Sequence, residues 1–398
     1  MSNVVLRNIE GADFRASPEY QLVVFDRLPC EQQDALKDLT KDPDFYGVLV
    51  PQGSGIRSAK SVSQDTALLF LTLSTPCPIP AYVRTKLGDS CNQTAAELVL
   101  DGILEIAHDG HFVCGSEAYE VIYGGPPITK PGDPLAEMSL NALKYAQALD
   151  IDDSVRLSAR LYLYNRVPLS TQWKKKFPTR DAVAAILGIE SGGANRRYLD
   201  GRWTSLKVSP QQEGWFHWES RTSQRGNIAP RQGYKLYLSP QPKCVRDAFR
   251  VLLEVLTESN AYHFKVGNNA AGVLRPDKIV IYFWDFESLN QTARQIATRL
   301  EGCPPQGVPF TACVTDDGLL SWGIDPLPQE GVLAWQERES WRLWVTNRLA
   351  VALLAAKNAP SRTLEPWQFA LERLRLDNVN TETWAPQAAF GHPAAAEG

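Results

Sequence analysis

The most regular pattern in the chain lies in its second half, and it constrains the fold more than any other segment. GYKLYLSP (233–240) and AYHFKVG (261–267) alternate polar and apolar side chains as β-strands do. Between them, KCVRDAFRVLLEVLTES (243–259) places its apolar residues at helical spacing. RPDKIVIYFWDF (275–286) is a third strand and LNQTARQIATRLEG (289–302) a second helix. This order predicts an α+β fold, close to α/β, in which helices pack on a mixed sheet.

A stretch rich in glycine and proline, GGPPITKPGDP (124–134), marks the main boundary in the chain. We therefore expect an N-terminal accessory or peptide-docking unit at residues 1–125 and a larger domain at 126–360. Residues 361–398 form a C-terminal extension whose low-complexity end, APQAAFGHPAAAEG, is expected to fray.

The N-terminal unit is predicted to be a smaller α/β unit. TAAELVLDGILEI (94–106) has helical spacing, and ILEIAHDGHFVCG (103–115) is typical of a hairpin around His-Asp-Gly. A helix followed by a hairpin is the order found in a winged-helix module, and a structural cap on the main domain is the alternative.

Three more elements are expected in the larger domain. RLSARLYLYNRVP (156–168) alternates like a strand that stops at Pro168. The lysine run 174–176 is expected in a solvated loop, and FTACVTDDGLLSWG (310–323) in a hairpin around Asp-Asp-Gly.

Charge is distributed unevenly along the chain. The net charge is −4, yet residues 156–250 contain 18 Lys or Arg against 6 Asp or Glu, a local balance of +12, so the remainder carries −16. A basic segment in an acidic protein indicates a locally anionic partner or substrate, and an ordinary solvated surface is the alternative.

Several classes of protein are excluded. No apolar run approaches the eighteen residues of a membrane span, and the start has no secretory signal pattern. The 7 cysteines are scattered without CxxC spacing. Among the histidines, only His108 and His111 are close enough in sequence to suggest a metal site, and they lie on either side of an expected turn. The chain also lacks P-loop, GxGxxG, HExxH, GxSxG, HRD and DFG motifs. We expect a cytoplasmic protein without metal or cofactor.

Aromatic residues among arginines raise one further alternative. Trp203, Trp215 and Trp218 lie in the basic segment, and such interleaving can bind single-stranded nucleic acid. The pI of about 5.9 and the absence of an RNP or OB pattern argue against it.

Cationic side chains on the predicted strands are the candidate site. Alternation places Lys235 and Tyr237 on one face of their strand, and His263 and Lys265 on one face of theirs. If the two strands are adjacent, all four side chains lie together, and Arg275 opens the next strand. Solvent-facing lysines are the structural alternative.

Such a cluster has a definite chemistry. Neighbouring cations bind phosphate through charge-assisted hydrogen bonds, and they lower one another's pKa so that a lysine can act as a neutral base. Positive charge stabilises the enolate formed when a Cα proton leaves. Tyr237 or His263 could then protonate the departing phosphate. The pattern favours β-elimination of phosphate from phosphoserine or phosphothreonine.

The stretch YKLYLSP, AYHFKVG, LRPDKIVIYF and LLSWGIDP resembles the HopA-type effector family, over roughly residues 140–355. That family includes the lyase component of class V lanthipeptide synthetases and of thioamitide pathways. The resemblance implies a phosphorylated ribosomal precursor peptide as substrate, a separate kinase-like partner protein, and dehydroalanine or dehydrobutyrine as product.

The chain is also distantly similar to phosphothreonine lyases, which carry a base lysine in a Lys-x-His strand and a second lysine on a neighbouring strand. Here Lys235 stands in Lys-x-Tyr and Lys265 follows, so the similarity implies that Lys235 is the base. Tyr237 replaces the acid histidine. Either Tyr237 or His263 must supply the proton, or the phosphate leaves unprotonated on its arginine clamp.

The remaining candidates are expected to bind phosphate or peptide. Beside Lys265, the similarity implies that Arg275, Tyr282 and either Arg338 or Arg342 bind phosphate, and Arg231 of the basic segment is a further phosphate-binding candidate. The basic segment before the first key strand is expected to grip the peptide through Arg202, Trp203, Arg221 and Arg225.

A non-catalytic protein is the alternative to a lyase. The same fold could hold a phosphopeptide or a leader peptide without eliminating phosphate, as a subunit of a synthetase complex or an effector-like scaffold.

Overall fold

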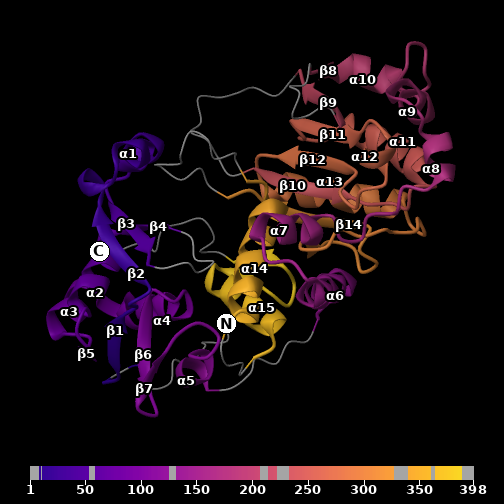
Figure 1. Ribbon diagram of the computed structural model, residues 1–398. Coiled ribbons are helices and arrows are strands. Elements are labelled where there is room, and N and C mark those ends of the chain that lie inside the picture. The colour runs from indigo at the N-terminus through magenta and orange to yellow at the C-terminus, as the bar shows by residue number, and fades with distance from the viewer. Residues whose placement is uncertain are drawn as a thin grey trace. The chain divides into compact units, whose positions relative to one another are not determined.

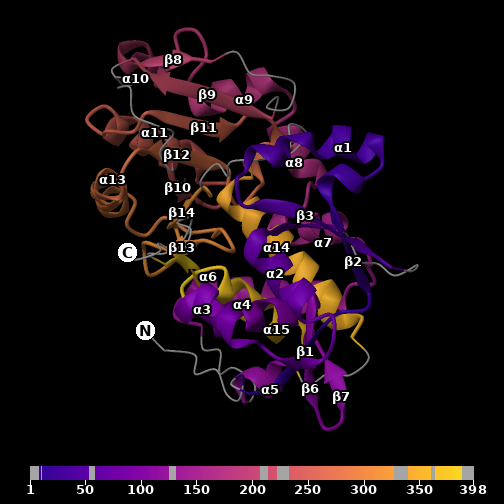
Figure 2. The ribbon, with the colours of Figure 1, turned by 90° about the vertical axis from the view of Figure 1, so that its left-hand side faces the viewer.

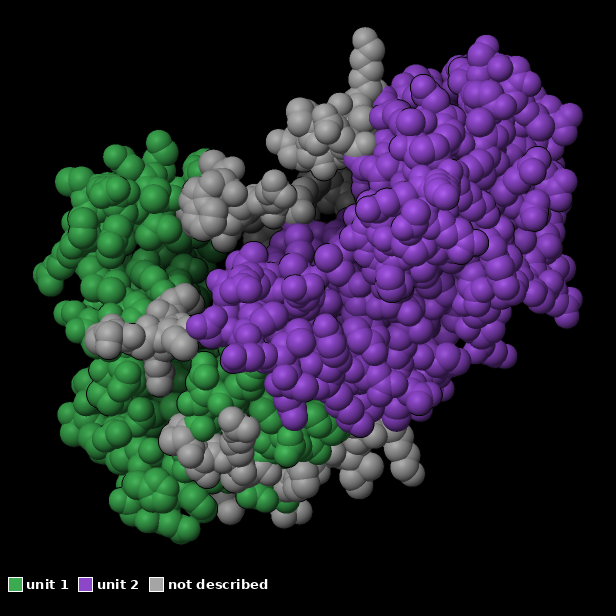
Figure 3. Space-filling view, turned by 45° about the vertical axis from the view of Figure 1, so that its right-hand side comes forward, with its two compact units in different colours: residues 1–128, 328–338, 351–376 green, residues 129–327, 339–350, 377–398 purple. Residues whose placement is uncertain are grey.

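The chain divides into two compact units, each built from several segments. Unit 1 comprises residues 1–128, 328–338 and 351–376, and unit 2 comprises residues 129–327, 339–350 and 377–398 (Figure 3). The computed structural model describes residues 9, 11–52, 59–124, 131–206, 214–221, 233–326, 339–359 and 364–387. Within these ranges, no helix combines the length and the apolar character needed to cross a membrane.

Unit 1 contains two antiparallel sheets, in the strand orders β5-β1-β6-β7 and β2-β3-β4. The strands are β1 (Asp13–Ala16), β2 (Tyr20–Val24), β3 (Phe45–Pro51), β4 (Lys60–Ser63), β5 (Cys77–Pro78), β6 (Leu104–His108) and β7 (His111–Val113). The helices are α1 (Cys30–Leu36), α2 (Gln64–Thr72), α3 (Ala81–Leu87), α4 (Cys91–Leu100), α5 (Tyr119–Tyr123) and α15 (Pro366–Leu376), with short 3-10 turns at Phe25–Arg27, Lys37–Lys41 and Gly88–Ser90.

The hairpin predicted around His-Asp-Gly is confirmed. His108 pairs with His111 across the turn, and Asp109 and Gly110 both have positive φ, at 48° and 81°. Two consecutive left-handed residues give the turn the twist that two antiparallel strands require. Helix α4 precedes the hairpin, so the helix–hairpin order is present, in a sheet that also contains β1 and β5.

Unit 2 is built on a seven-stranded sheet in the order β13-β14-β10-β12-β11-β9-β8, most of which can be followed in Figure 1. The strands are β8 (Trp203–Ser205), β9 (Trp215–Ser220), β10 (Tyr234–Leu238), β11 (His263–Gly267), β12 (Ile279–Phe283), β13 (Ala312–Cys313) and β14 (Leu320–Ile324), and a separate pair is formed by β15 (Val379–Asn380) and β16 (Ala385–Pro386). The helices are α6 (Pro134–Ala148), α7 (Ser154–Tyr162), α8 (Thr171–Lys176), α9 (Arg180–Leu187), α10 (Arg196–Arg202), α11 (Val245–Leu256), α12 (Ala270–Val273) and α13 (Phe286–Arg299). Helix α14 (Trp341–Lys357) has its first ten residues in unit 2.

The α+β class is confirmed, but the sheet of unit 2 is not mixed. All its described strand pairs are antiparallel. The chain leaves β10, passes through α11 and returns in β11, which would make a parallel pair if the two strands were neighbours. Strand β12 inserts between them and runs antiparallel to both. The sheet is therefore antiparallel although its strand–helix–strand order is typical of parallel units.

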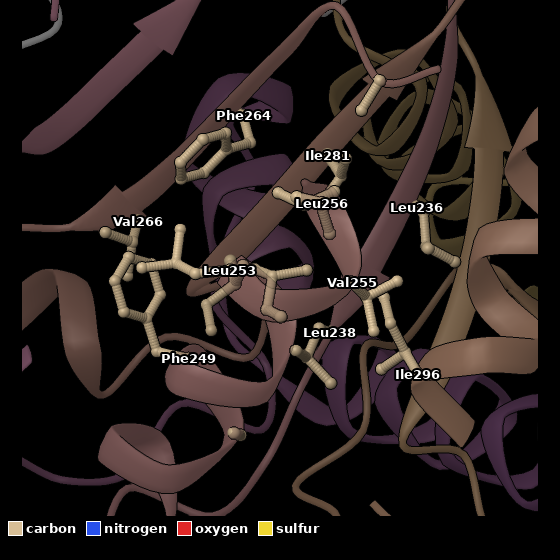
Figure 4. Packing of buried hydrophobic residues seen from close by; sticks show 14 of the residues in the cluster. Leu236, Leu238, Phe249, Leu253, Val255, Leu256, Phe264, Val266, Ile281 and Ile296 are labelled. Atoms are coloured by element: carbon tan, nitrogen blue, oxygen red, sulfur yellow. The ribbon is translucent and has the colours of Figure 1, made fainter. Parts of the chain in front are cut away.

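One face of this sheet is apolar and forms the core of unit 2. Helix α11 buries Phe249, Leu252, Leu253 and Leu256, which recur at helical spacing, against the sheet. Figure 2 shows α11 and α13 beside the sheet, and Figure 4 shows buried apolar side chains of this cluster packed together. From the strands, Leu236, Leu238, Phe264, Val266, Ile279, Ile281 and Phe283 join this cluster. The alternate side chains of these strands lie on the other face and are not part of this core.

The strand predicted at residues 156–168 is wrong, because this segment begins as helix α7. The Asp153 side chain accepts a hydrogen bond from the Arg156 backbone N–H at 2.7 Å and caps the helix. Leu157 and Leu161, four residues apart, are both fully buried. Leucines four residues apart can face the core in a helix as well as in a strand, and the cap by Asp153 favours the helix. The lysine run 174–176 likewise lies in the last turn of α8 rather than in a loop.

Phe264 should be among the most important core residues of unit 2. Its ring is fully buried, stacks on Trp218 at 4.9 Å between centroids and meets Trp203 edge-on at 4.7 Å. We expect Phe264→Ala to lower the free energy of unfolding of unit 2 by about 3–5 kcal/mol, because it removes apolar contacts and leaves a cavity. Denaturant unfolding followed by tryptophan fluorescence measures the change. Val155→Ala, at a side chain 75% exposed, is the control and should stay within about 0.5 kcal/mol of the unmodified protein.

Candidate active site

The face of the unit 2 sheet opposite the core carries the predicted site residues. In the β10-β12-β11 register, Lys235, Tyr282 and His263 lie in one row across the three strands. Tyr237 and Lys265 lie in the next row, on either side of Val280. Strands β10 and β11 are not adjacent, because β12 lies between them. Since rows two residues apart share a face, these side chains still lie on one side. We refer to this side as the cationic face.

Strand β9 extends the cationic face with residues that the sequence analysis missed. His217 lies opposite Lys265, and Glu219 lies opposite His263. Trp215 is on the same side of β9, where its ring contacts Lys265. The alternation in WFHWES (215–220) was the available signal, since it separates Trp215, His217 and Glu219 from the core-facing residues.

Lys235 is held in an ion pair at one side of the face. Its Nζ lies 2.6 Å from Oδ2 of Asp325, and its side chain is only 8% exposed. The same Nζ lies 5.2 Å from the centre of the Tyr282 ring. Asp325 also accepts a hydrogen bond from the backbone N–H of Trp341 at 2.9 Å, at the start of α14. Lys235 is therefore fixed by the end of β14 and the first turn of α14.

Lys265 is in a different environment. Its Nζ lies over the ring of Trp215 at 4.5 Å and 5.8 Å from the ring of Tyr282, and it has no carboxylate within ion-pair distance in the part of the chain that the structure describes. Burial lowers the pKa of Lys265, while Tyr162 and Asp277 oppose part of that shift. Lys265 thus has a greater tendency to be neutral than an ordinary lysine.

Arg275 is held by a buried carboxylate. Its Nε and Nη2 donate to the two carboxylate oxygens of Asp277 at 2.8 and 2.9 Å, and Nη2 also donates to the hydroxyl of Tyr162 at 3.1 Å. Trp215 stacks on the guanidinium at 4.9 Å. The structure records no protein partner for Nη1 among the described residues, and the side chain is 22% exposed. Arg275 can therefore offer this nitrogen to a ligand.

Arg342, expected to bind phosphate, is instead buried within the protein. Its side chain is 1% exposed, Nη1 lies 3.0 Å from Oδ2 of Asp277, and Nε and Nη2 donate to the carbonyls of Pro309 and Tyr162 at 3.2 and 2.7 Å. Arg342 thus supports Asp277 and hence Arg275. Trp341 precedes it and packs on Gly323, where an added Cβ would meet the indole at 2.4 Å.

The ionisation of this cluster follows from its burial and its charges. Burial raises the pKa of Asp277, but Arg275 and Arg342 outweigh it and hold the pKa well below its usual range. Burial raises the pKa of Tyr162, helped by Asp277. A charged carboxylate therefore lies between two guanidiniums, and Tyr162 donates its hydroxyl proton to Asp277 at 3.1 Å.

The two histidines of the face form a pair. Nδ1 of His217 lies 3.2 Å from Nε2 of His263, and their rings stack with centroids 5.3 Å apart. Burial and Lys265 lower the pKa of His217 to about 4, and burial, His217 and both lysines lower the pKa of His263 to about 3. Both imidazoles are therefore neutral at pH 7. The His263 ring also contacts Tyr282 at 4.7 Å.

Two tyrosines complete the face. Tyr237 is 3% exposed, and burial together with Asp325 raises its pKa well above the ordinary value. Burial raises the pKa of Tyr282 to about 12, against the effect of Lys235. Both remain protonated, and so can donate hydrogen bonds, across the physiological range.

Lys278 is a further buried cation that the sequence analysis missed. It lies two residues before Val280 and donates from Nζ to Oε1 of Gln306 at 2.7 Å. Burial lowers its pKa to about 7, partly opposed by Asp277. The cationic face and its surround thus hold five cationic side chains against three carboxylates, and this composition favours an anionic ligand. The five are Lys235, Lys265, Lys278, Arg275 and Arg342, and the three are Glu219, Asp277 and Asp325.

The residues expected to grip the peptide lie elsewhere. Trp203 is 2% exposed and packs in the apolar core, on the face opposite Lys235 and Lys265, so its expected peptide contact is wrong. Arg202 donates to the carbonyls of Thr257 and Ser259, and Arg221 donates to the carbonyl of Asp200 at 2.7 Å. Both arginines hold backbone in place. Arg225, Arg231 and Arg338 lie outside the described residues.

Metal-ligating residues do not gather in the described ranges. Within them, no group of three or more His, Cys, Asp or Glu side chains could hold a metal ion. The histidine pair of the cationic face contributes only two such ligands.

Comparisons with known proteins give a distant structural likeness. No protein family and no curated protein matches the chain. Effector proteins from Pseudomonas syringae pv. tomato strain DC3000 and pv. syringae strain 61 align with TM-scores of 0.39 and 0.40, at 13% and 11% identity, over 64% of this chain and 98% and 97% of theirs. The type III effector and phosphothreonine lyase OspF from Shigella flexneri aligns with a TM-score of 0.27 at 15% identity, over 46% of this chain and 89% of its own. Because likeness at this level does not establish activity, the chemistry of the cationic face has to be judged from its own side chains.

Asp277 should control the stability of unit 2 in acid. Because its folded-state pKa is lowered, its contribution is complete above the unfolded carboxyl value of about 4 and is lost as the pH falls further. We expect Asp277→Asn to destabilise unit 2 by about 3–5 kcal/mol at pH 7, since the buried guanidinium of Arg342 and the half-buried one of Arg275 lose their counter-charge.

Denaturant unfolding between pH 3 and pH 7 tests this expectation. The difference between the unmodified protein and Asp277→Asn should shrink toward pH 3. The exposed Asp152→Asn is the control, and equal unfolding free energies for all three proteins at pH 7 would contradict the role given to Asp277.

Proposed function

We propose that the cationic face is the active site of a lyase that eliminates phosphate from phosphoserine or phosphothreonine in a peptide. The observation that carries the proposal is Lys265, a half-buried lysine of lowered pKa without a carboxylate partner among the described residues. It lies near Arg275, which is held by Asp277 with one nitrogen unpaired. A base of lowered pKa next to a fixed anion-binding group is what the reaction requires.

The elimination is balanced without an oxidant or reductant. A base takes the Cα proton, the electron pair of that C–H bond forms the Cα=Cβ double bond, and the Cβ–O bond breaks. The phosphate leaves with the electron pair of the Cβ–O bond, and the residue becomes dehydroalanine or dehydrobutyrine. Three tasks follow for the protein: proton removal, stabilisation of the enolate, and charge stabilisation on the phosphate.

We assign proton removal to Lys265. The sequence similarity implied Lys235 as the base instead. Only an unprotonated amine can accept the Cα proton, and burial moves Lys265 toward that form. Lys235 is engaged as a cation by Asp325 at 2.6 Å. An ammonium fixed in this way is better suited to stabilise the enolate oxygen.

We assign phosphate binding to Arg275. Tyr282 lies between the two lysines. The unpaired Nη1 of Arg275 provides a charge-assisted donor, and the bidentate contact with Asp277 keeps the guanidinium from turning. His263 is neutral, with a pKa of about 3, so it can donate a hydrogen bond but is not a cationic acid at pH 7. Tyr237 is protonated and remains the other donor.

We propose, from the sequence resemblance to the HopA-type family, that the substrate is a phosphorylated ribosomal precursor peptide in a lanthipeptide-type pathway. A separate kinase-like protein would phosphorylate the serine or threonine, and both steps would take place in the cytoplasm. The local balance of +12 in residues 156–250 supports an anionic substrate.

Mass spectrometry of a phosphopeptide tests the activity. We expect each turnover to remove the mass of phosphoric acid, whereas hydrolysis would leave the hydroxyl peptide. Lys265→Ala should lower the rate by about 10²–10⁴-fold, the usual contribution of a general base. Lys175→Ala, at an exposed lysine of α8, is the matched control and should keep the rate. Binding of the phosphopeptide without loss of mass would favour the non-catalytic alternative.

The pH dependence separates the two lysines. Because the neutral form of Lys265 is the active one and its pKa is lowered, the rate should rise with pH and level off at a lower pH than an ordinary lysine would give. Initial rates between pH 6 and pH 10 measure this limb. The limb should be absent from the residual rate of Lys265→Ala and present in Lys235→Ala. The opposite result would return the role of base to Lys235.

A further inference from the structure

The contact between His217 and His263 requires that the two rings share one proton between them. An N···N hydrogen bond of 3.2 Å needs one N–H and one lone pair, and both imidazoles are neutral. The tautomer of one ring therefore fixes that of the other. Either His217 donates from Nδ1 and His263 carries its proton on Nδ1, or His263 donates from Nε2 and His217 carries its proton on Nε2.

The surroundings of His217 decide between the two tautomers. Its Nε2 is buried and has no hydrogen-bond partner among the described residues, and the residue is 5% exposed. The charges acting on this ring are cationic, from Arg180 and from Lys265 when it is protonated. A lone pair directed into a positive field is favoured over an N–H without an acceptor. The proton of His217 therefore belongs on Nδ1, where it is donated to His263.

The other groups around the pair act on His263 in both directions. Lys265 on β11 and Lys235 on β10 lie near His263, and their positive charges disfavour an N–H that points toward them. The Tyr282 ring on β12 lies 4.7 Å from the His263 ring between centroids, tilted by 48°. Glu219 on β9 lies opposite His263 in the register and is the one carboxylate of this row among the described strands. An acceptor beside His263 favours an N–H on that ring.

We propose that His217 is a positioning residue that holds His263 in the Nδ1–H tautomer, so that His263 offers a fixed N–H donor to the anion bound on the cationic face. This inference rests on the proposed function for the identity of the anion, a phosphate on a peptide. His263 would contact the leaving group, and His217 would act only through His263. The pair gives a neutral donor near Lys235 and Lys265, which a single histidine free to change tautomer would not.

The tautomers can be measured directly in the whole protein. Long-range ¹H–¹⁵N correlation spectra of ¹⁵N-histidine-labelled protein distinguish a protonated Nδ1 from a protonated Nε2. We expect the Nδ1–H form for both His217 and His263. Finding His263 with its proton on Nε2 would overturn the proposal, and this measurement does not depend on lyase activity.

Two substitutions separate positioning from packing. The amide of His217→Asn places an N–H near the position of Nδ1, whereas His217→Phe keeps an aromatic ring and removes the donor. We expect His263 to stay in the Nδ1–H form in the Asn variant and to populate both forms in the Phe variant. His108→Phe, at an exposed hairpin histidine, is the control and should leave His263 unchanged. An unchanged tautomer in a folded Phe variant would contradict the role of His217.

Kinetics and a phosphate titration complete the test. On a phosphopeptide, His217→Phe should lower kcat by about 10–100-fold with a smaller change in KM, as removal of an orienting partner usually does, and His217→Asn should retain more of the rate. Inorganic phosphate should shift the Nδ1–H signal of His263 in the unmodified protein. If the unmodified protein eliminates no phosphate but shows this shift, the proposed lyase activity fails and the donor site stands. If it eliminates phosphate while the signal does not respond, the donor role fails.

Discussion

The carboxylate of Asp277 is the interaction on which the cationic face depends. It accepts two hydrogen bonds from Arg275 and lies 3.0 Å from Arg342, and Tyr162 donates to it as well. These partners come from α7, α14 and the approach to β12, so one buried charge ties together three parts of unit 2. Without it, the buried guanidinium of Arg342 and the half-buried one of Arg275 would have no counter-charge, which costs several kcal/mol. With it, Arg275 is fixed and keeps one nitrogen for a ligand.

The two faces of the sheet differ in whether burying their side chains is favourable. Leu236 and Phe264 face α11 and α13 and gain free energy by leaving water. Lys235 and Lys265 lie one residue along the same strands, where Lys235 is buried and Lys265 is half-buried. This burial is unfavourable, because an ammonium loses hydration. An ion pair with Asp325 offsets that cost for Lys235, and for Lys265 the cost appears as a lowered pKa. The free energy gained by burying the apolar face therefore offsets the unfavourable burial of the cations on the other face.

Local pattern predicted much of unit 2 and failed where distant residues decide. The strands β10, β11 and β12 lie in their predicted segments, because alternation over five or six residues is a strong signal. The segment 156–168 failed, because an Asp153 cap and a spacing of four compete with alternation there. His217 and Asp325 were missed, because neither residue type nor spacing shows that β9 and the end of β14 border the face.

The sequence by itself determined which side chains share a face, since period-two alternation is a property of each strand alone. It therefore placed Lys235 with Tyr237, and His263 with Lys265, before any pairing was known. Only the tertiary structure decided that β12 separates these pairs and that Asp325 holds one lysine while the other is left without a carboxylate among the described residues. Hydrogen-bond register and burial depend on residues far apart in the chain. Those contacts give two chemically equal lysines different environments, and with them different proposed roles.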